Sequence, residues 1–177
     1  MRIISGKYRG MKLAEFSGSE IRPTADRVKE SLFNILYGKF AGARVLDLFC
    51  GSGNLGIESL SRGAHSVHFN DLSPRSVAVL RGNLDKLKAE NFTVTNLDYS
   101  ACLTRVKGFD IIFIDPPYAS DAGVRALEII GANSLLNEGG VAVYERDIPF
   151  RGEIVGLEKY DERRYGKTYL TFFRVSL

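Results

Sequence analysis

The feature that most constrains the fold is a strand-like segment that runs through glycines into a helical one. Residues 44–49 are largely apolar, Gly51–Gly56 is rich in glycine, and residues 54–62 are predicted to form a helix. A chain that turns through glycines at the start of a helix lets backbone N–H groups approach a ligand closely. The sequence therefore predicts a ligand site at this turn.

Strand-like and helical segments alternate along the rest of the chain. Helices are predicted over 26–40, 74–88, 101–106 and 121–131, and strands over 66–70, 92–96, 110–115 and 140–145. Such alternation forms a parallel sheet with helices on both faces, and ligands bind beyond the carboxyl ends of its strands. The last strand-like segments, 153–160 and 168–175, flank a polar turn at 161–167 and predict an antiparallel edge.

Residues 1–14 contain four basic side chains and no acid, and they predict two short strands around Gly6–Gly10. We expect them to form a small N-terminal β-hairpin extension that projects from a single domain covering residues 1–177. Lys7, Arg9 and Lys12 are candidate contacts for nucleic-acid phosphates. Charge alone leaves open the alternative of a solvated surface strand.

The composition is that of an ordinary soluble domain. The 177 residues are 45% hydrophobic and 25% charged, and no apolar run approaches the roughly 18 residues that cross a bilayer. Two cysteines and two histidines supply neither a disulfide framework nor a zinc site. We expect a cytoplasmic protein with no membrane segment and no metal. The net charge of +3 does not by itself identify a nucleic-acid binder.

Asp47 distinguishes two cofactors that the glycine turn could bind. Gly51–Gly56 matches the dinucleotide pattern G-x-G-x-x-G, which alone is a weak signal. A carboxylate shortly before the first glycine would repel a dinucleotide's pyrophosphate, whereas it would attract the sulfonium and ammonium groups of S-adenosylmethionine (SAM). Asp47 therefore favours SAM, and a nicotinamide-dependent oxidoreductase is the alternative.

Two further acids follow predicted strands at positions that suit an adenosine. Asp71 lies 20 residues after Gly51, where a carboxylate can hold ribose hydroxyls, although it could instead begin the next helix at Ser73. Asp98 could accept a hydrogen bond from the adenine amino group or belong to a turn. Both roles fit SAM and a nicotinamide cofactor equally, because both cofactors contain adenosine.

The tetrapeptide Asp115–Tyr118 follows a buried, strand-like run. Pro116 and Pro117 remove backbone donors and fix the chain, which leaves a carboxylate, rigid carbonyl groups and the aromatic face of Tyr118. These groups suit a flat base, since the acceptors can bind an exocyclic amino group while the tyrosine stacks on the ring. Accepting the amino hydrogens favours a nitrogen whose lone pair is free to attack. The alternative is an ordinary Pro-Pro turn.

Together, Asp47–Gly56 and Asp115–Tyr118 resemble the class I SAM-dependent methyltransferases that act on exocyclic amino groups. The resemblance extends to Met1–Gly10, Arg22–Asn34 and Tyr165–Thr168, which are similar to the RsmD family of 16S rRNA guanine-N2 methyltransferases. It implies a Rossmann-like α/β fold: a mostly parallel seven-stranded sheet with an antiparallel strand at the C-terminal end. It also implies 16S rRNA as the partner, free or within the small ribosomal subunit. Nothing in the sequence indicates an obligate partner face, so we expect a monomer.

The resemblance implies a role for each matching site residue. The implied SAM-binding residues are Asp47, Phe49, Gly51 and Gly53 around the pocket, Asp71 at the ribose, Asp98 at the adenine, and Arg22 and Thr24 near the methionine end. The implied catalytic residues around the target guanine are Asp115, Pro116, Pro117 and Tyr118.

The implied reaction is direct transfer of the SAM methyl group to N2 of an unpaired or flipped-out guanine. Asp115 would be the main polar contact of the amino group. Because amino-group chemistry is shared, an adenine-N6 methyltransferase acting on DNA or RNA is the alternative, and only the N-terminal signature favours guanine. A non-catalytic RNA-binding factor is a third interpretation, but it leaves Asp115–Tyr118 without a purpose.

Overall fold

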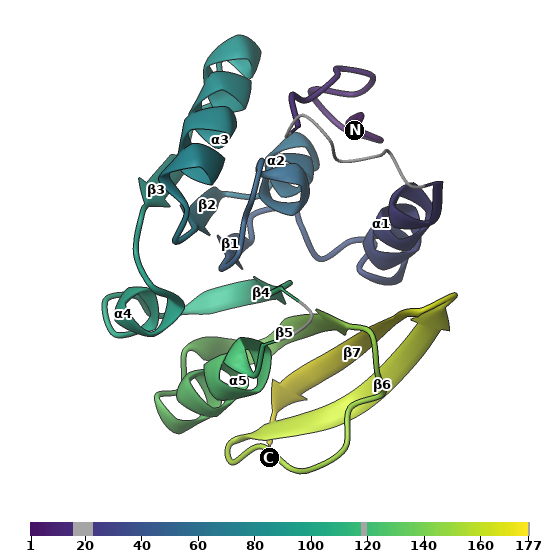
Figure 1. Ribbon diagram of the computed structural model, residues 1–177, viewed down its shortest axis with the longest axis vertical. Coiled ribbons are helices and arrows are strands. Elements are labelled where there is room, and N and C mark those ends of the chain that lie inside the picture. The colour runs from purple at the N-terminus through teal and green to yellow at the C-terminus, as the bar shows by residue number, and fades with distance from the viewer. Residues whose placement is uncertain (16–22, 118–119, 177) are drawn as a thin grey trace.

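The computed structural model describes residues 1–15, 23–117 and 120–176 (Figure 1). In chain order the elements are α1 (Pro23–Ile35), β1 (Arg44–Asp47), α2 (Asn54–Ser61), β2 (Ser66–Asn70), α3 (Pro74–Leu87), β3 (Phe92–Thr95), α4 (Tyr99–Leu103), β4 (Phe109–Ile114), α5 (Ala122–Ala132), β5 (Leu136–Arg146), β6 (Leu157–Tyr165) and β7 (Thr168–Val175).

In the described part of the chain the strands form one seven-stranded sheet in the order β3-β2-β1-β4-β5-β7-β6. The strands from β1 to β5 pair in parallel, while β7 runs antiparallel to both of its neighbours, β5 and β6. The predicted fold class is therefore confirmed. The all-apolar stretch of β4 lies at the centre, because only a strand covered on both faces can bury every side chain.

Helices cover the two faces of this sheet and create two hydrophobic clusters. One cluster lies under α1, α2 and α3 and contains Val45, Ile111 and Phe113 from the sheet. The other lies under α4 and α5 and contains Leu46 and Ile112. Successive residues of a strand point to opposite faces, so neighbours in sequence enter different clusters. Figure 1 shows this division, with α1–α3 on one side of the sheet and α4 and α5 on the other.

The N-terminal segment turns back on itself as expected, but it does not project from the domain. Its two arms are joined by one antiparallel bridge, Arg2↔Lys12, instead of two regular strands. Ile3, Tyr8 and Leu13 are buried in the cluster under α1–α3. The carboxylate of Glu58 in α2 accepts hydrogen bonds from the backbone N–H groups of residues 4 and 5. Apolar side chains on one face and these hydrogen bonds hold the segment against α2.

Several element boundaries differ from those predicted. The helix expected over 26–40 ends at Ile35, and the one expected over 101–106 begins at Tyr99, because Asp98 caps its N-terminus. The polar residues 161–165, predicted as a turn, continue β6. This strand lies at the edge of the sheet, where charged side chains remain solvated and oppose pairing with another chain.

Candidate active site

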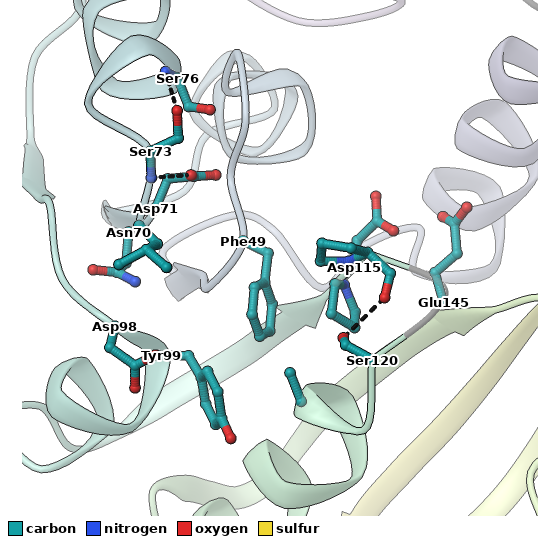
Figure 2. Close-up of a pocket in the computed structure, with 14 residues that line it drawn as sticks. Phe49, Asn70, Asp71, Ser73, Ser76, Asp98, Tyr99, Asp115, Ser120 and Glu145 are labelled. Atoms are coloured by element: carbon teal, nitrogen blue, oxygen red, sulfur yellow. Dashed lines mark hydrogen bonds between the residues drawn. The ribbon is translucent and has the colours of Figure 1, made fainter.

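A cavity of about 730 Å³ opens at the carboxyl ends of the parallel strands. Its lining comes from the segments that follow β1, β2, β3 and β4, together with the end of β5. In Figure 2, the ring of Phe49 lies between two groups of side chains. Asn70, Asp71, Asp98 and Tyr99 form one group, and Asp115, Ser120 and Glu145 form the other. The cavity therefore has two halves that meet at one aromatic side chain.

The glycine turn brings β1 and α2 close together. Gly53 has φ 88°, and a Cβ atom there would lie 2.3 Å from Leu80 Cδ1, so a larger residue would be both strained and crowded. A Cβ at Gly56 would lie 2.2 Å from the ring of Phe69. Gly51 and Gly53 do not line the cavity directly. They shape the turn, and residues next to this turn line the cavity.

Asp47 is buried at the end of β1, and its Oδ2 accepts a hydrogen bond from Gly56 N at 2.9 Å. Burial raises the pKa of Asp47 to about 7, the Gly56 hydrogen bond opposes that rise, and the charge of Asp71 adds to it. The side chain borders a smaller pocket of about 120 Å³. Phe49, Asp115 and Glu145 line both this pocket and the large cavity.

Asp71 ties the glycine turn to the start of α3. Its Oδ2 accepts from Gly51 N at 2.9 Å and its Oδ1 accepts from Ser73 N at 2.8 Å. Ser73 is the N-cap of α3, and its side chain accepts from Ser76 N. The two alternatives posed for Asp71 are thus compatible, since the carboxylate organises the helix start and also lines the cavity.

Asp98 and Tyr99 form the wall of the cavity at α4. Asp98 is the N-cap of this helix, and its Oδ1 accepts from Ser100 N at 2.9 Å and from Ser100 Oγ at 2.6 Å. These hydrogen bonds lower the pKa of Asp98. The rings of Phe49 and Tyr99 lie 5.6 Å apart, centroid to centroid, at 39° to each other. This half of the cavity thus offers two aromatic faces and two carboxylates.

The second half is built on the residues that follow β4. Asp115 opens into the cavity, yet enclosure by the surrounding protein, reinforced by the charges of Glu145 and Asp47, raises its pKa well above that of an ordinary aspartate. The carbonyl oxygen of Pro117 accepts from Ser120 N at 3.1 Å and from Ser120 Oγ at 2.9 Å. Ser120 therefore holds the carbonyl group of Pro117 in place.

Glu145 and Asn70 are cavity residues that the sequence analysis missed. Glu145 follows the apolar run of β5, as Asp47 and Asp115 follow those of β1 and β4, so the same strand-end acid pattern could have identified it. Asn70 is buried, donates to the carbonyl oxygens of Leu48 and Leu97, and accepts from Thr95 Oγ1. It joins the ends of three strands beneath the cavity.

Other predicted residues lie away from the cavity or outside the description. Lys7, Arg9 and Lys12 are exposed on the N-terminal segment and line neither pocket. Arg22, Tyr118 and the side chain of Thr24 lie outside the described residues. Within the described ranges, no cluster of three histidine, cysteine or acidic side chains could hold a metal ion. None of the described helices is both long and apolar enough to span a membrane.

Comparisons with known proteins cover almost the whole chain. The family described as "Conserved hypothetical protein 95" matches residues 1–174. The chain is 36% identical over 181 residues to the "Putative rRNA methyltransferase YlbH" of Bacillus subtilis, with 98% of each sequence covered. It is 36% identical over 152 residues to the "Ribosomal RNA small subunit methyltransferase D" of Haemophilus influenzae, covering 83% of this chain and 79% of that protein.

A solved structure has the same fold over nearly its full length. The "Putative methyltransferase yhhF from Escherichia coli" has a TM-score of 0.88 and 31% identity to this chain, covering 99% of this chain and 97% of that one. The matched residues include every segment that lines the two halves of the cavity. The chain therefore belongs to the Conserved hypothetical protein 95 family of RsmD-like rRNA methyltransferases.

Proposed function

We propose that this protein transfers the methyl group of SAM to the exocyclic N2 amino group of a guanine in the RNA of the small ribosomal subunit. The observation that carries this proposal is the single cavity in which an adenosine-like half meets the Asp115–Pro117 segment across Phe49. Family membership supports an rRNA substrate, and the relative from Haemophilus influenzae is named for the small subunit.

The first half of the cavity suits SAM. Asp71 lies at the end of β2, where its carboxylate can accept the ribose hydroxyls, and Asp98 can accept the adenine amino group. Phe49 and Tyr99 offer faces for the adenine ring. Asp47 lies in the smaller pocket, where a carboxylate attracts the cationic methionine end of SAM. Gly51 and Gly53 hold these groups in place through the turn, and Arg22 and Thr24 remain predicted contacts of that end.

The second half suits a purine with an exocyclic amino group. Asp115 and the Pro116 carbonyl are acceptors on a backbone that two prolines and Ser120 fix. Tyr118 remains the predicted stacking partner of the base. A base within a duplex cannot enter a cavity of this kind, so the target nucleotide is unpaired or flipped out.

The reaction follows from these positions. The N2 lone pair attacks the methyl carbon of the sulfonium, the carbon–sulfur bond breaks, and its electrons remain on sulfur in S-adenosylhomocysteine. The nitrogen, which carries a positive charge after the transfer, loses one proton to Asp115 or to water. SAM is already activated, so the protein supplies position and electrostatics.

The experiment that tests the function combines the purified protein with SAM bearing a labelled methyl group. The substrates are naked small-subunit rRNA and small subunits from cells that lack the protein. Nucleoside mass spectrometry should show labelled N2-methylguanosine at one position, and sequencing of the modified RNA should locate it. Labelled N6-methyladenosine would instead support the adenine alternative, and no labelled nucleoside in either substrate would contradict the proposal.

The basic N-terminal segment is the proposed contact for RNA phosphates. Lys7, Arg9 and Lys12 are exposed, while the backbone of residues 4 and 5 in the same segment is hydrogen-bonded to Glu58 of α2. Replacing all three by glutamine should weaken RNA binding and reduce its salt dependence, because fewer counterions are released. SAM affinity should not change. An unaltered slope of log Kd against log salt concentration would contradict this role.

A further inference from the structure

Glu145 lies next to Asp115 because of the pairing between β4 and β5. The register of these parallel strands places Phe113 beside Val143 and Ile114 beside Tyr144, so the next pair is Asp115 and Glu145. Phe113 and Val143 both face the cluster under α1–α3, whereas Ile114 and Tyr144 both face the cluster under α4 and α5. Alternation along a strand therefore directs both acids to the α1 side. Figure 2 shows their carboxylates extending in the same direction.

The two carboxylates create a region that favours hydrogen-bond donors. Both residues line the large cavity and the smaller pocket, and their mutual repulsion contributes to the raised pKa of Asp115. A ligand that brings two N–H groups side by side would relieve this repulsion most effectively.

Nucleobases differ in the atoms that they present beside the amino group. Guanine carries an N1–H donor next to its N2 amino group, so its Watson–Crick edge offers two adjacent donors. Adenine and cytosine carry an unprotonated ring nitrogen beside the amino group, and that nitrogen is an acceptor. A carboxylate oxygen facing this acceptor would lose its hydration without gaining a donor, which makes the contact strongly discriminating.

We infer that Glu145 accepts the N1–H of the target guanine while Asp115 accepts the neighbouring N2–H, and that Glu145 thereby selects guanine over adenine. This inference rests on the proposed methyl transfer to guanine and deepens it. Neighbouring strands lie about 4.8 Å apart, and each carboxylate reaches a donor at about 2.9 Å. The adjacent N–H groups of one purine edge therefore fit between side chains from neighbouring strands. Glu145 is a specificity residue, and Asp115 contacts the reacting nitrogen.

A substrate analogue tests the inference without altering the protein. 2-Aminopurine keeps the 2-amino group of guanine but has an unprotonated N1. Placed by ligation at the methylated position of small-subunit rRNA, it should be methylated by the unmodified protein with a kcat/KM about 10²-fold below that of guanine. Equal kcat/KM values for the two bases would overturn the inference, while methylation of guanine itself would leave the proposed function intact.

The Glu145→Gln variant sharpens the test, because a glutamine amide can donate to the unprotonated N1. At saturating SAM, which removes any effect of the variant on SAM affinity, the ratio of kcat/KM for guanine to that for 2-aminopurine should fall at least about 10-fold. Glu138→Gln is the matched control, since Glu138 is an exposed acid in the same strand and lines neither active-site pocket. An unchanged ratio in a folded Glu145→Gln variant would overturn the inference. Failure of the unmodified protein to methylate guanine would refute the proposed function instead.

Discussion

The acids proposed to face SAM and those proposed to face the target base differ in what they do for the fold. Asp47, Asp71 and Asp98 each accept backbone N–H groups, and each fixes the start of a helix or a turn. Asp115 has no such partner among the described residues, and it lies beside Glu145 in the next strand. The first group is part of the folded framework, whereas the second places two carboxyl groups side by side where the target base is proposed to bind.

This difference has a physical consequence for mutations. A carboxylate that accepts backbone hydrogen bonds stabilises the fold, and its removal leaves donors without partners. A carboxylate that is enclosed and crowded by another destabilises the fold in its charged form. Substitution of Asp71 or Asp98 should therefore reduce stability and SAM affinity together. Substitution of Asp115 should reduce methyl transfer without reducing stability or SAM affinity.

The largest expected effect is that of Asp115→Asn on methyl transfer. Loss of a positioned acceptor and proton-accepting group should lower kcat by about 10²- to 10⁴-fold. SAM affinity should stay within about twofold, and the melting temperature at pH 8 should rise, because the variant lacks the carboxyl group whose raised pKa makes folding less favourable at this pH. Single-turnover kinetics, calorimetry and thermal unfolding measure these quantities. A parallel loss of SAM affinity would abolish the distinction between the halves.

Asp47 should make stability depend on pH. Its pKa is about 7 in the folded protein and about 3.8 in the unfolded chain, so the folded state retains the proton more strongly. The free energy of unfolding should therefore fall as pH rises from about 4 to about 7, by at most about 4 kcal/mol from this group. Asp47→Asn, which keeps an acceptor for Gly56 N–H, should remove this component. If the unmodified protein and Asp47→Asn showed the same dependence of the free energy of urea unfolding on pH, the raised pKa of Asp47 would be contradicted.

Asp71→Ala should cost both stability and SAM affinity. The change removes the acceptor for Gly51 N and Ser73 N, and we expect the free energy of unfolding to fall by about 2–3 kcal/mol. SAM should bind at least about 10-fold more weakly, since the ribose acceptor is lost and the turn is loosened. Urea unfolding and calorimetry test both effects. Asp71→Asn, which keeps one acceptor, should have a stability and a SAM affinity between those of the unmodified protein and those of Asp71→Ala.

The smallest effect is expected for Asp98→Ala. Loss of an N-cap side chain costs about 1 kcal/mol, and α4 is short, so the change in melting temperature should be small but measurable. SAM affinity should decrease by only a few-fold, because this carboxylate is exposed and solvent weakens its hydrogen bonds. If methyl transfer were abolished while SAM affinity stayed normal, Asp98 would act on the target base and not on SAM, which would contradict its assignment.

The sequence predicted most of the elements because their signals are local. Alternating strands and helices, Ser73 before Pro74, and acids at strand ends all depend on residues that are close in the chain. The errors arose where a segment's partner is distant in sequence. The sequence predicts a projecting N-terminal segment. It misses the hydrogen bonds that hold this segment on α2, because Glu58, which accepts them, lies more than 50 residues away in the chain. The charged residues 161–165 form an edge strand only because β7 pairs with them.

The sequence by itself determined the fold class, the glycine turn and the acids at Asp47, Asp71, Asp98 and Asp115, since each follows from a spacing or a strand end. Only the tertiary structure decided which acids act together. The register of β4 and β5 brings Glu145 beside Asp115, although 30 residues separate them in the chain. Strand pairing brings these two residues together, because the order and register of the strands are fixed by packing on both faces of the sheet and not by local sequence.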